Sequence, residues 1–343
     1  MSSRPRFQLQ AFAPGWGATV MGTGVTSVIL SAWATIGFAP GLTQTASRIM
    51  LIVTLALAIP VVSLMITRLI THRDTARTEL AHPVMGAMHV TLGGALLVPA
   101  VALGRAGAGW IPEAVLHPII YALTAAGSLI TLIIGWIFLT TMFRRGDVPI
   151  GQVTGAWFIP PVLTVVIPLA LVPTFREGST LSQELVWLSW AALGTGSMLY
   201  LALTAVLVYR HVSAPLPPAA LAPTLIIGMG PAGLIGLDVL VLSNSGGAYP
   251  FAVAMWGFGL WWAIAALIVI RHGYPTRAFG LPAWAYTFPF GAWVVAGIMI
   301  GHTVGSLTIL WVSSAAGAIM FAVWAWVAYR TLRGVLNGQM WVS

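Results

Sequence analysis

Apolar runs long enough to cross a membrane recur along the whole chain, and they restrict its fold more than any other feature. A helix needs roughly 20 apolar residues to cross the hydrocarbon core of a bilayer. Only 6% of the 343 residues are charged, whereas soluble domains carry about 25%. The sequence therefore predicts an all-α polytopic membrane protein that forms a single transmembrane domain over residues 1–343.

Ten spans are predicted, joined by short connections. They are 16–38, 47–70, 83–104, 114–143, 152–173, 184–211, 218–242, 248–271, 281–303 and 307–333. The odd-numbered spans begin 63–69 residues apart, which indicates five helical hairpins of similar length, a possible internal repeat. An alternative for the first span is a cleaved signal peptide, because Arg4 and Arg6 precede it and AWA at 32–34 loosely resembles a cleavage site.

Glycine and proline separate the odd spans from the even ones. The odd spans hold 27 Gly and Pro residues and the even spans hold 10. Both residues cost helix stability, and in membranes they are tolerated where helices pack closely or line a cavity. We therefore expect the odd spans to form a broken, closely packed inner ring, with the smoother even spans facing lipid.

The arginines predict the orientation of the chain. All fifteen basic residues are arginine, and they lie at the ends of apolar runs. With the amino terminus in the cytoplasm, twelve lie inside and only Arg48, Arg105 and Arg176 lie outside. This positive-inside bias predicts that both termini are cytoplasmic in a plasma (cell inner) membrane protein. The net charge of +8 is thus no sign of nucleic-acid binding, and the absence of cysteine excludes disulfides and thiolate metal sites.

Residues 228–238, GMGPAGLIGLD, contain the pattern G-x-G-x-x-G. A dinucleotide fingerprint needs a preceding strand, a soluble helix and an acidic residue about 20 positions on. Here the glycines lie inside an apolar span, and Asp238 follows Gly233 by five residues. The match is accidental. We expect these glycines to leave one face of the seventh span without side chains. We expect Pro231 to break the hydrogen-bond ladder of the helix and so expose backbone groups toward the ring.

Ionisable residues within the spans are functional candidates. Asp238 is expected near the outer face, either as an interfacial carboxylate at a pore rim or as a proton-coupling residue. His89 is expected near the cytoplasmic side and His302 near the outer side, too far apart to share a metal or haem. His302 and Asp238 could share a depth and form a pair.

No pattern in the chain indicates an enzyme, a metal site or a cofactor. We find no Ser-His-Asp order, carboxylate pair, metal-ligand spacing or P-loop. An almost uncharged interior suits anions, which helix amino termini attract without a buried arginine. Two alternatives stay open: a membrane redox protein that binds haem through His89, His302 or His117, and a membrane scaffold or sensor that transports nothing.

Five motifs, one in each odd span, resemble those of the tellurite-resistance/dicarboxylate transporter family. They are MGTG at 21–24 followed by VTSVIL, HPVMGA at 82–87, WFIPPV at 157–162, GPAGLIGLDVLVL at 230–242 and WAYTFPFG at 284–291. That family includes slow anion channels, malate permeases, sulfite efflux pumps and tellurite-resistance proteins. The resemblance covers nearly the whole chain.

The resemblance implies five helical hairpins in a quasi-fivefold arrangement around a central pore, commonly as a homotrimer. It also implies a phenylalanine gate on the ninth span, which matches Phe288, with Phe290 as the second choice; a core aromatic packed beside Pro289 is the alternative. The expected pore-lining residues are Met21, Gly22, Thr23, Gly24, His89, Gly230, Pro231 and Gly233.

The resemblance also narrows the substrate. The motifs of the seventh and ninth spans look most like those of sulfite efflux pumps and malate permeases. We therefore expect a small anion, sulfite or a C4-dicarboxylate such as malate, with a chloride or nitrate channel as the alternative. The spans hold no arginine suited to clamping two carboxylates, which counts against a tight dicarboxylate site.

Overall fold

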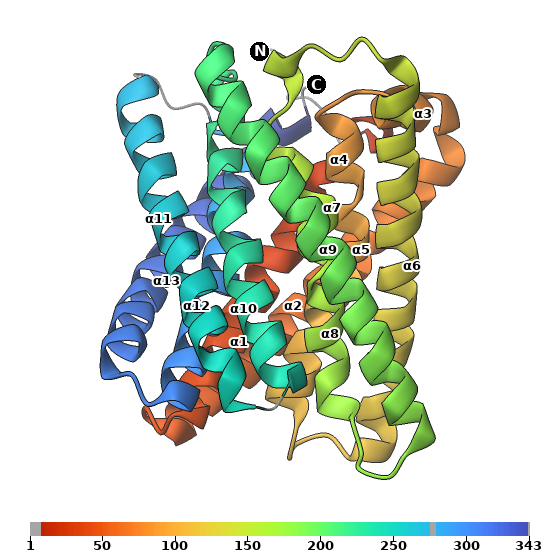
Figure 1. The fold of residues 1–343 in the computed structure, drawn as a ribbon. Coiled ribbons are helices and arrows are strands. Elements are labelled where there is room, and N and C mark those ends of the chain that lie inside the picture. Colours follow the sequence, from red (N-terminus) through yellow and green to blue (C-terminus); the bar gives the residue numbers. More distant parts are fainter. Residues whose placement is uncertain (1–7, 244, 275–278, 342–343) are drawn as a thin grey trace.

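The described part of the chain is a bundle of helices (Figure 1). A computed structural model describes residues 8–243, 245–274 and 279–341, so Arg4, Arg6 and Arg277 lie outside the described residues. Within these ranges there is no β-strand, and ten helical segments are long and apolar enough to cross a membrane. The prediction of an all-α membrane protein with ten spans is confirmed.

The outer spans are single long helices and the inner spans are broken. The outer helices are α2 (Pro40–Thr71), α6 (Glu113–Arg145), α9 (Thr180–Ser213), α11 (Tyr249–Gly273) and α13 (Leu307–Leu336). The inner spans contain α1 (Gly17–Thr35), α4 (Met85–His89) with α5 (Thr91–Ala102), α7 (Ile159–Thr164) with α8 (Val166–Leu171), α10 (Met229–Ser243) and α12 (Phe288–Val304). A short helix, α3 (Arg73–Leu80), follows α2.

Burial separates the two sets of spans as the glycine and proline counts predict. In the most apolar stretch of each odd span, 78–89% of residues are buried, against 22–28% in the even spans. Each inner span packs against the outer span that follows it, which forms five hairpins. The even spans thus present their apolar side chains outward, where a bilayer would cover them.

The inner spans close into a ring. α1 packs on α5, α5 on α8, α10 on α7 and α8, and α12 on both α10 and α1, so the ninth span returns to the first. This closed order is compatible with the predicted quasi-fivefold arrangement. Gly155 shows how closely the spans approach, because a side chain there would collide with the carbonyl oxygen of Thr224 on the neighbouring span.

Four of the five inner spans begin with a short 3-10 helix. These segments are Pro14–Trp16, Gly155–Phe158, Ala219–Gly228 and Leu281–Tyr286. Three of these segments contain a proline, which lacks the N–H that a continuous α-helix needs, and Pro160 lies two residues after the fourth. Further breaks lie between α7 and α8 and at the π-helical turn Leu103–Gly107.

Outer helices satisfy several of the carbonyl groups that these breaks release. The hydroxyl of Tyr200 donates to the carbonyl of Gly228 at 2.8 Å, and Trp262 Nε1 donates to the carbonyl of Leu225 at 2.8 Å. These two carbonyls bond outward, because a buried carbonyl without a donor is costly in a bilayer. Neither belongs to Ile227, four residues before Pro231, so the expectation that Pro231 frees backbone groups toward the ring stays a prediction.

The outer helix α2 begins earlier than predicted. Its expected start was residue 47, but the helix starts at Pro40, a residue that favours the first helical turn. The polar stretch 43–47 lowers the local hydropathy, so the apolar pattern does not reveal this extension. The helix consequently extends past its apolar run at this end.

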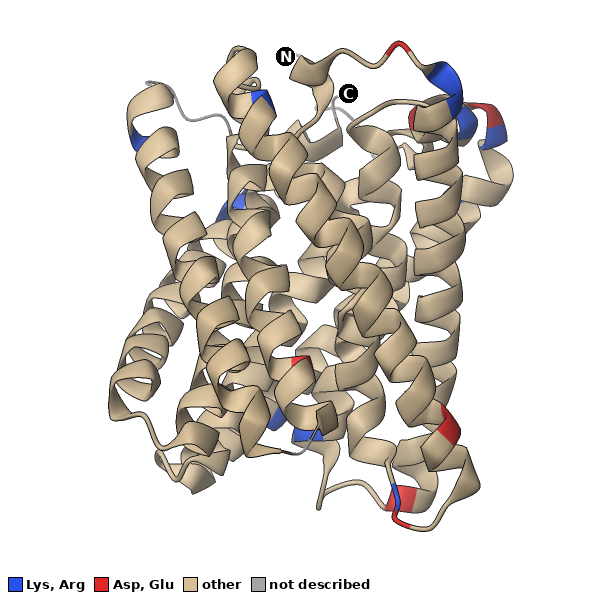
Figure 2. Cartoon of the chain, in the orientation of Figure 1, with Lys and Arg blue, Asp and Glu red and all other residues tan. Residues whose placement is uncertain are grey.

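Both described ends of the chain lie at the same end of the bundle, which we call the terminal end (Figure 1). Charged residues gather mostly near the two ends of the bundle (Figure 2). At the end opposite the terminal end, the Arg48 guanidinium stacks over Trp110 at 5.6 Å. An even number of spans explains the shared side of the two ends; the cytoplasmic location of that side stays a prediction.

Candidate functional site

A small cavity lies at the centre of the ring, and all five inner spans contribute to it. Its volume is about 50 Å³, enough for a few water molecules. The lining residues are Gly15, Ala18, Met21, Met88, Thr91, Ile159, Val162, Thr224, Ile227, Leu281, Pro282, Trp284, Ala285, Phe288 and Pro289. We call this the central cavity. Of the residues expected to form the gate and line the pore, it contains Phe288 and Met21.

The central cavity is mostly apolar, and its two hydroxyl groups are engaged. Thr91 Oγ1 donates to the carbonyl of Pro14 at 2.7 Å, and Thr224 Oγ1 donates to the carbonyl of Leu221 at 2.7 Å. No lining residue carries a charge. An anion in this cavity would therefore meet aliphatic and aromatic side chains, threonine oxygens and backbone dipoles.

Four α-helical segments begin near the central cavity. α5 begins at Thr91 and α12 at Phe288, both lining residues. α1 begins one residue before Ala18, and α10 begins two residues after Ile227. Each continues directly from a preceding 3-10 or α-helical turn, so the first N–H groups of these segments are partly bonded and carry less of the positive charge of a free helix amino terminus.

Apolar side chains fill the ring beside this cavity. A methyl group on Gly94 would lie 2.5 Å from Met21 Sδ and 3.0 Å from either δ-carbon of Leu163. The side chains of Met21 and Leu163 therefore occupy the space that Gly94 leaves free. The ring is packed at this point and holds no continuous open channel there.

Most of the other expected lining residues lie at contacts between helices. Gly22 packs against the ninth span, Gly24 against α5 and α2, and Gly230 and Gly233 against α12. The hydroxyl of Thr23 accepts a hydrogen bond from a tryptophan of α13 at 3.3 Å. None of these five is among the residues that line the central cavity, so their place in a conduction path stays a prediction.

Asp238 lies on α10 in the inner ring, on the same helix face as Pro231 and Leu234, which precede it by seven and four residues. All three residues are buried. The place of Asp238 on a transport path stays a prediction.

The environment of Asp238 differs from the expected pore rim. Its side chain is completely buried, and neither carboxyl oxygen has a hydrogen-bond partner among the described residues. His302 is exposed, so the structure does not bring the two side chains together as a pair. The helices packed around α10 enclose Asp238, which position along the chain alone does not reveal.

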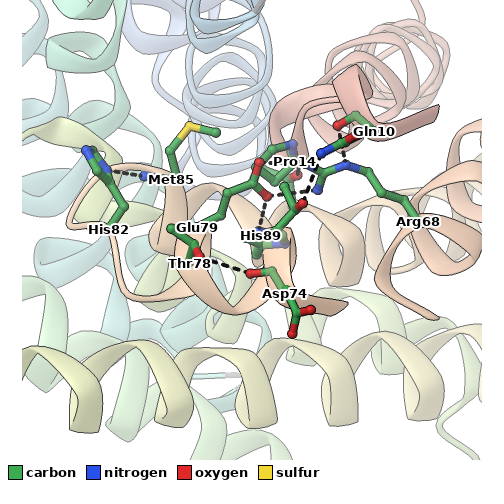
Figure 3. Close-up of polar contacts among 11 residues, drawn as sticks. Gln10, Pro14, Arg68, Asp74, Thr78, Glu79, His82, Met85 and His89 are labelled. Atoms are coloured by element: carbon green, nitrogen blue, oxygen red, sulfur yellow. Dashed lines mark hydrogen bonds and ion pairs between the residues drawn. The ribbon is translucent and has the colours of Figure 1, made fainter. Parts of the chain in front are cut away.

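A buried ionic cluster lies at the terminal end of the third span (Figure 3). Arg68 on α2 holds Glu79 on α3 through two hydrogen bonds of 2.8 and 2.6 Å, and Arg68 Nε donates to the carbonyl of Gln10 at 3.0 Å. His89 Nε2 lies 3.0 Å from Oε2 of Glu79, the oxygen that also accepts from Arg68 Nη1. We call Arg68, Glu79 and His89 the ionic cluster.

The ionic cluster fixes the start of an inner span. His89 was expected to line the pore, but its ring is directed at Glu79, and it lies next to Met88, a residue that does line the central cavity. Burial raises the pKa of Glu79, but hydrogen bonds from His89 and Arg68 and the charge of Arg68 outweigh this and lower the pKa to about 2. Sequence reasoning missed Glu79, because its partners are 10 and 11 residues away along the chain.

His82 and His117 hydrogen-bond to neighbouring groups. His82 Nδ1 accepts hydrogen bonds from the N–H groups of Val84 and Met85 at the start of α4 (Figure 3). His117 lies 3.3 Å from a guanidinium nitrogen of Arg176. Among the described residues, no three His, Asp or Glu side chains are grouped to hold a metal ion.

Comparison with known proteins places the chain in a family. A family model described as the voltage-dependent anion channel matches residues 11–332, and the chain belongs to this family. It is 30% identical over 345 residues to an uncharacterized transporter of Methanocaldococcus jannaschii, with 97% of this chain and 96% of the relative covered. It is 23% identical over 333 residues to a sulfite efflux pump of Trichophyton rubrum, with 86% and 83% covered.

These findings confirm the resemblance that the five motifs indicate. The family is one of anion channels and transporters, and sulfite efflux pumps are among the relatives of this chain. The protein is accordingly a multi-pass membrane protein of a transporter and channel family.

Proposed function

We propose that this protein transports small anions across the membrane through the centre of its inner ring, with the ring of Phe288 as the gate. The observation that supports this is the central cavity, to which all five inner spans contribute. Partial positive charge at helix amino termini attracts an anion without a buried cation. A phenyl ring blocks such a path by its bulk and clears it by rotating about two torsions.

We further propose that the inner helices separate slightly when the pore opens. The residues Gly22, Thr23, Gly24, Gly230, Pro231 and Gly233 would then border the path, and His89 would keep its place in the ionic cluster. The expected assembly is a homotrimer in the plasma (cell inner) membrane with both termini in the cytoplasm. Cross-linking of the protein in its native membrane tests the number of subunits.

Sulfite is the substrate that we propose first. The relatives named as sulfite efflux pumps support it, and so does the chemistry of the central cavity. None of the described residues that line this cavity is a cation, so they offer no two-point clamp for the carboxylates of malate. A compact anion needs only one centre of positive potential, which the helix amino termini supply.

Electrical recording tests the proposal. The purified protein is reconstituted in planar bilayers, and currents are measured under gradients of sulfite, malate, chloride and nitrate. We expect anion-selective currents whose reversal potentials rank sulfite above malate. Silence under every gradient, in liposome flux assays as well as in bilayers, would contradict transport; absorbance at the haem Soret band would instead support a membrane redox protein.

A second proposal concerns Asp238. A fully buried carboxyl group on α10 without a hydrogen-bond partner among the described residues is suited to take up and release a proton as an anion passes. We expect a pH gradient to accelerate sulfite efflux in the wild type and to lose this effect in Asp238→Asn. Both proteins meet the same sulfite and bisulfite mixture, so a gradient effect that is equal in the two would contradict this role.

A further inference from the structure

A second, larger cavity opens on the outer surface of the bundle between α11 and α13. Its volume is about 610 Å³, within the usual range of about 300–1,000 Å³ for ligand pockets. We call it the lateral cavity. Its mouth is formed by Leu267 and Ile319, which are 53% and 59% exposed, and its floor reaches Met229, which is 2% exposed. The lateral cavity is thus an apolar slot that faces lipid and ends against the inner ring.

One end of the lateral cavity is polar and positively charged. Arg271 lies in the last turn of α11, and Tyr274 follows that helix; both line the cavity. The guanidinium of Arg330 lies over the ring of Trp326, another lining residue, at 5.9 Å. Among the described residues, no carboxylate lines the lateral cavity. Its charge therefore complements an anion at the terminal end.

A buried hydroxyl and part of a buried guanidinium at this end lack hydrogen-bond partners. Tyr274 is 8% exposed, and its hydroxyl has no hydrogen-bond partner among the described residues. Arg210 on α9 is 1% exposed and interacts electrostatically with Tyr274; its Nη2 donates to the carbonyl of Gly151 at 3.1 Å, whereas Nε and Nη1 have no partner in the described part of the chain. Buried donors in this state cost free energy that an acceptor recovers. The site is therefore polar where a phosphate would bind and apolar where an acyl chain would bind.

We propose that the lateral cavity binds one anionic phospholipid. The acyl chain fills the slot between α11 and α13, and the phosphate accepts hydrogen bonds from Arg271 and from the Tyr274 hydroxyl, with Arg210 adding positive charge behind them. Basic pockets between transmembrane helices are a known place for such headgroups. Tyr286 and Phe290 also line the cavity, so the lipid packs against the start of α12 on the side away from the central cavity.

Native mass spectrometry of the full-length protein tests this proposal. The probes are dioleoyl phosphatidylglycerol and dioleoyl phosphatidylcholine, which share their chains and differ in net charge. The variant Arg271→Gln removes the exposed arginine, and Ile319→Trp places a bulky ring at the mouth. The control Arg73→Gln removes an exposed arginine from α3, outside the lateral cavity.

The wild type is expected to retain phosphatidylglycerol at least about fivefold more tightly than phosphatidylcholine, since one basic residue near a surface contributes about 1 kcal/mol. Arg271→Gln abolishes this preference, Ile319→Trp lowers retention of both lipids, and Arg73→Gln changes neither. Equal retention of the two lipids by the wild type overturns the proposal. A preference for phosphatidylglycerol that survives in Arg271→Gln also overturns the proposal. So does an Ile319→Trp variant that changes the number of subunits and leaves lipid retention intact. This last result would assign the cavity to a second copy of the chain.

Discussion

Replacing Glu79 by glutamine should destabilise the protein by about 2–3 kcal/mol. The change leaves the guanidinium of Arg68, whose side chain is 4% exposed, without its counter-charge. Breaking a buried ion pair by removing one partner costs about 3–5 kcal/mol, and the glutamine amide keeps part of the hydrogen bonding. Unfolding of the purified protein by SDS in mixed micelles measures this loss.

The pH dependence of stability gives a second, independent value for the contribution of Glu79 to the free energy of unfolding. The pKa of Glu79 falls from its ordinary value of 4.5 to about 2 in the folded protein. Its stabilising effect is therefore fully present above pH 4.5 and is lost as the pH falls from 4.5 toward 2. A shift of this size corresponds to about 3 kcal/mol in full, and to about 2 kcal/mol once solvent screening at the carboxylate is allowed for.

The matched control lies on the same helix. Asp74 forms an exposed pair with Arg77 at 3.7 Å, and exposed pairs contribute little, so Asp74→Asn should leave the unfolding midpoint unchanged. Between pH 5 and pH 3 the difference in stability between the wild type and Glu79→Gln should shrink. A Glu79→Gln protein as stable as the wild type at pH 7, with a difference that does not depend on pH, would refute this account of the ionic cluster.

Two further substitutions test how the inner spans are held. Trp262→Phe removes the hydrogen-bond donor to the Leu225 carbonyl of the seventh span and should cost about 1–2 kcal/mol of stability. The control is the same change at the neighbouring Trp261, which is 61% exposed. It should cause no measurable loss of stability in the SDS titration. Gly155→Ala drives a methyl group into a backbone carbonyl and should cost about 3 kcal/mol of stability or prevent folding. In the control Gly194→Ala the new methyl group meets no atom within 4 Å, so yield and stability should stay unchanged. Equal behaviour of the two alanine variants would contradict the close approach of the spans.

The arrangement of the spans was predictable because it follows from local properties of the chain. Apolar runs give the ten helices, and the uneven use of glycine and proline gives the inner and outer sets, since only closely packed helices tolerate so many breaks. The start of α2 at Pro40 was missed because the polar residues at 43–47 lower the local hydropathy, so the apolar pattern begins only after them.

The side-chain networks were not predictable from the sequence in the same way. Glu79 meets Arg68 and His89 only because α2, α3 and α4 fold back on one another. The full burial of Asp238 and the lateral cavity depend on how neighbouring helices diverge, and a single sequence carries no pattern for this. The family resemblance implied Phe288 as the gate, and the structure adds that Phe288 lines the central cavity whereas Phe290 lines the lateral one.

The most direct test of the proposed function compares Phe288→Ala with Phe290→Ala in planar bilayers under a sulfite gradient. The two phenylalanines are two residues apart on α12 and line different cavities, so each variant controls for the loss of a ring near the proline. Our account predicts that sulfite current rises several-fold in Phe288→Ala and stays at the wild-type level in Phe290→Ala. Unchanged current in Phe288→Ala, or a larger rise in Phe290→Ala, would contradict a pore through the inner ring that is gated by Phe288.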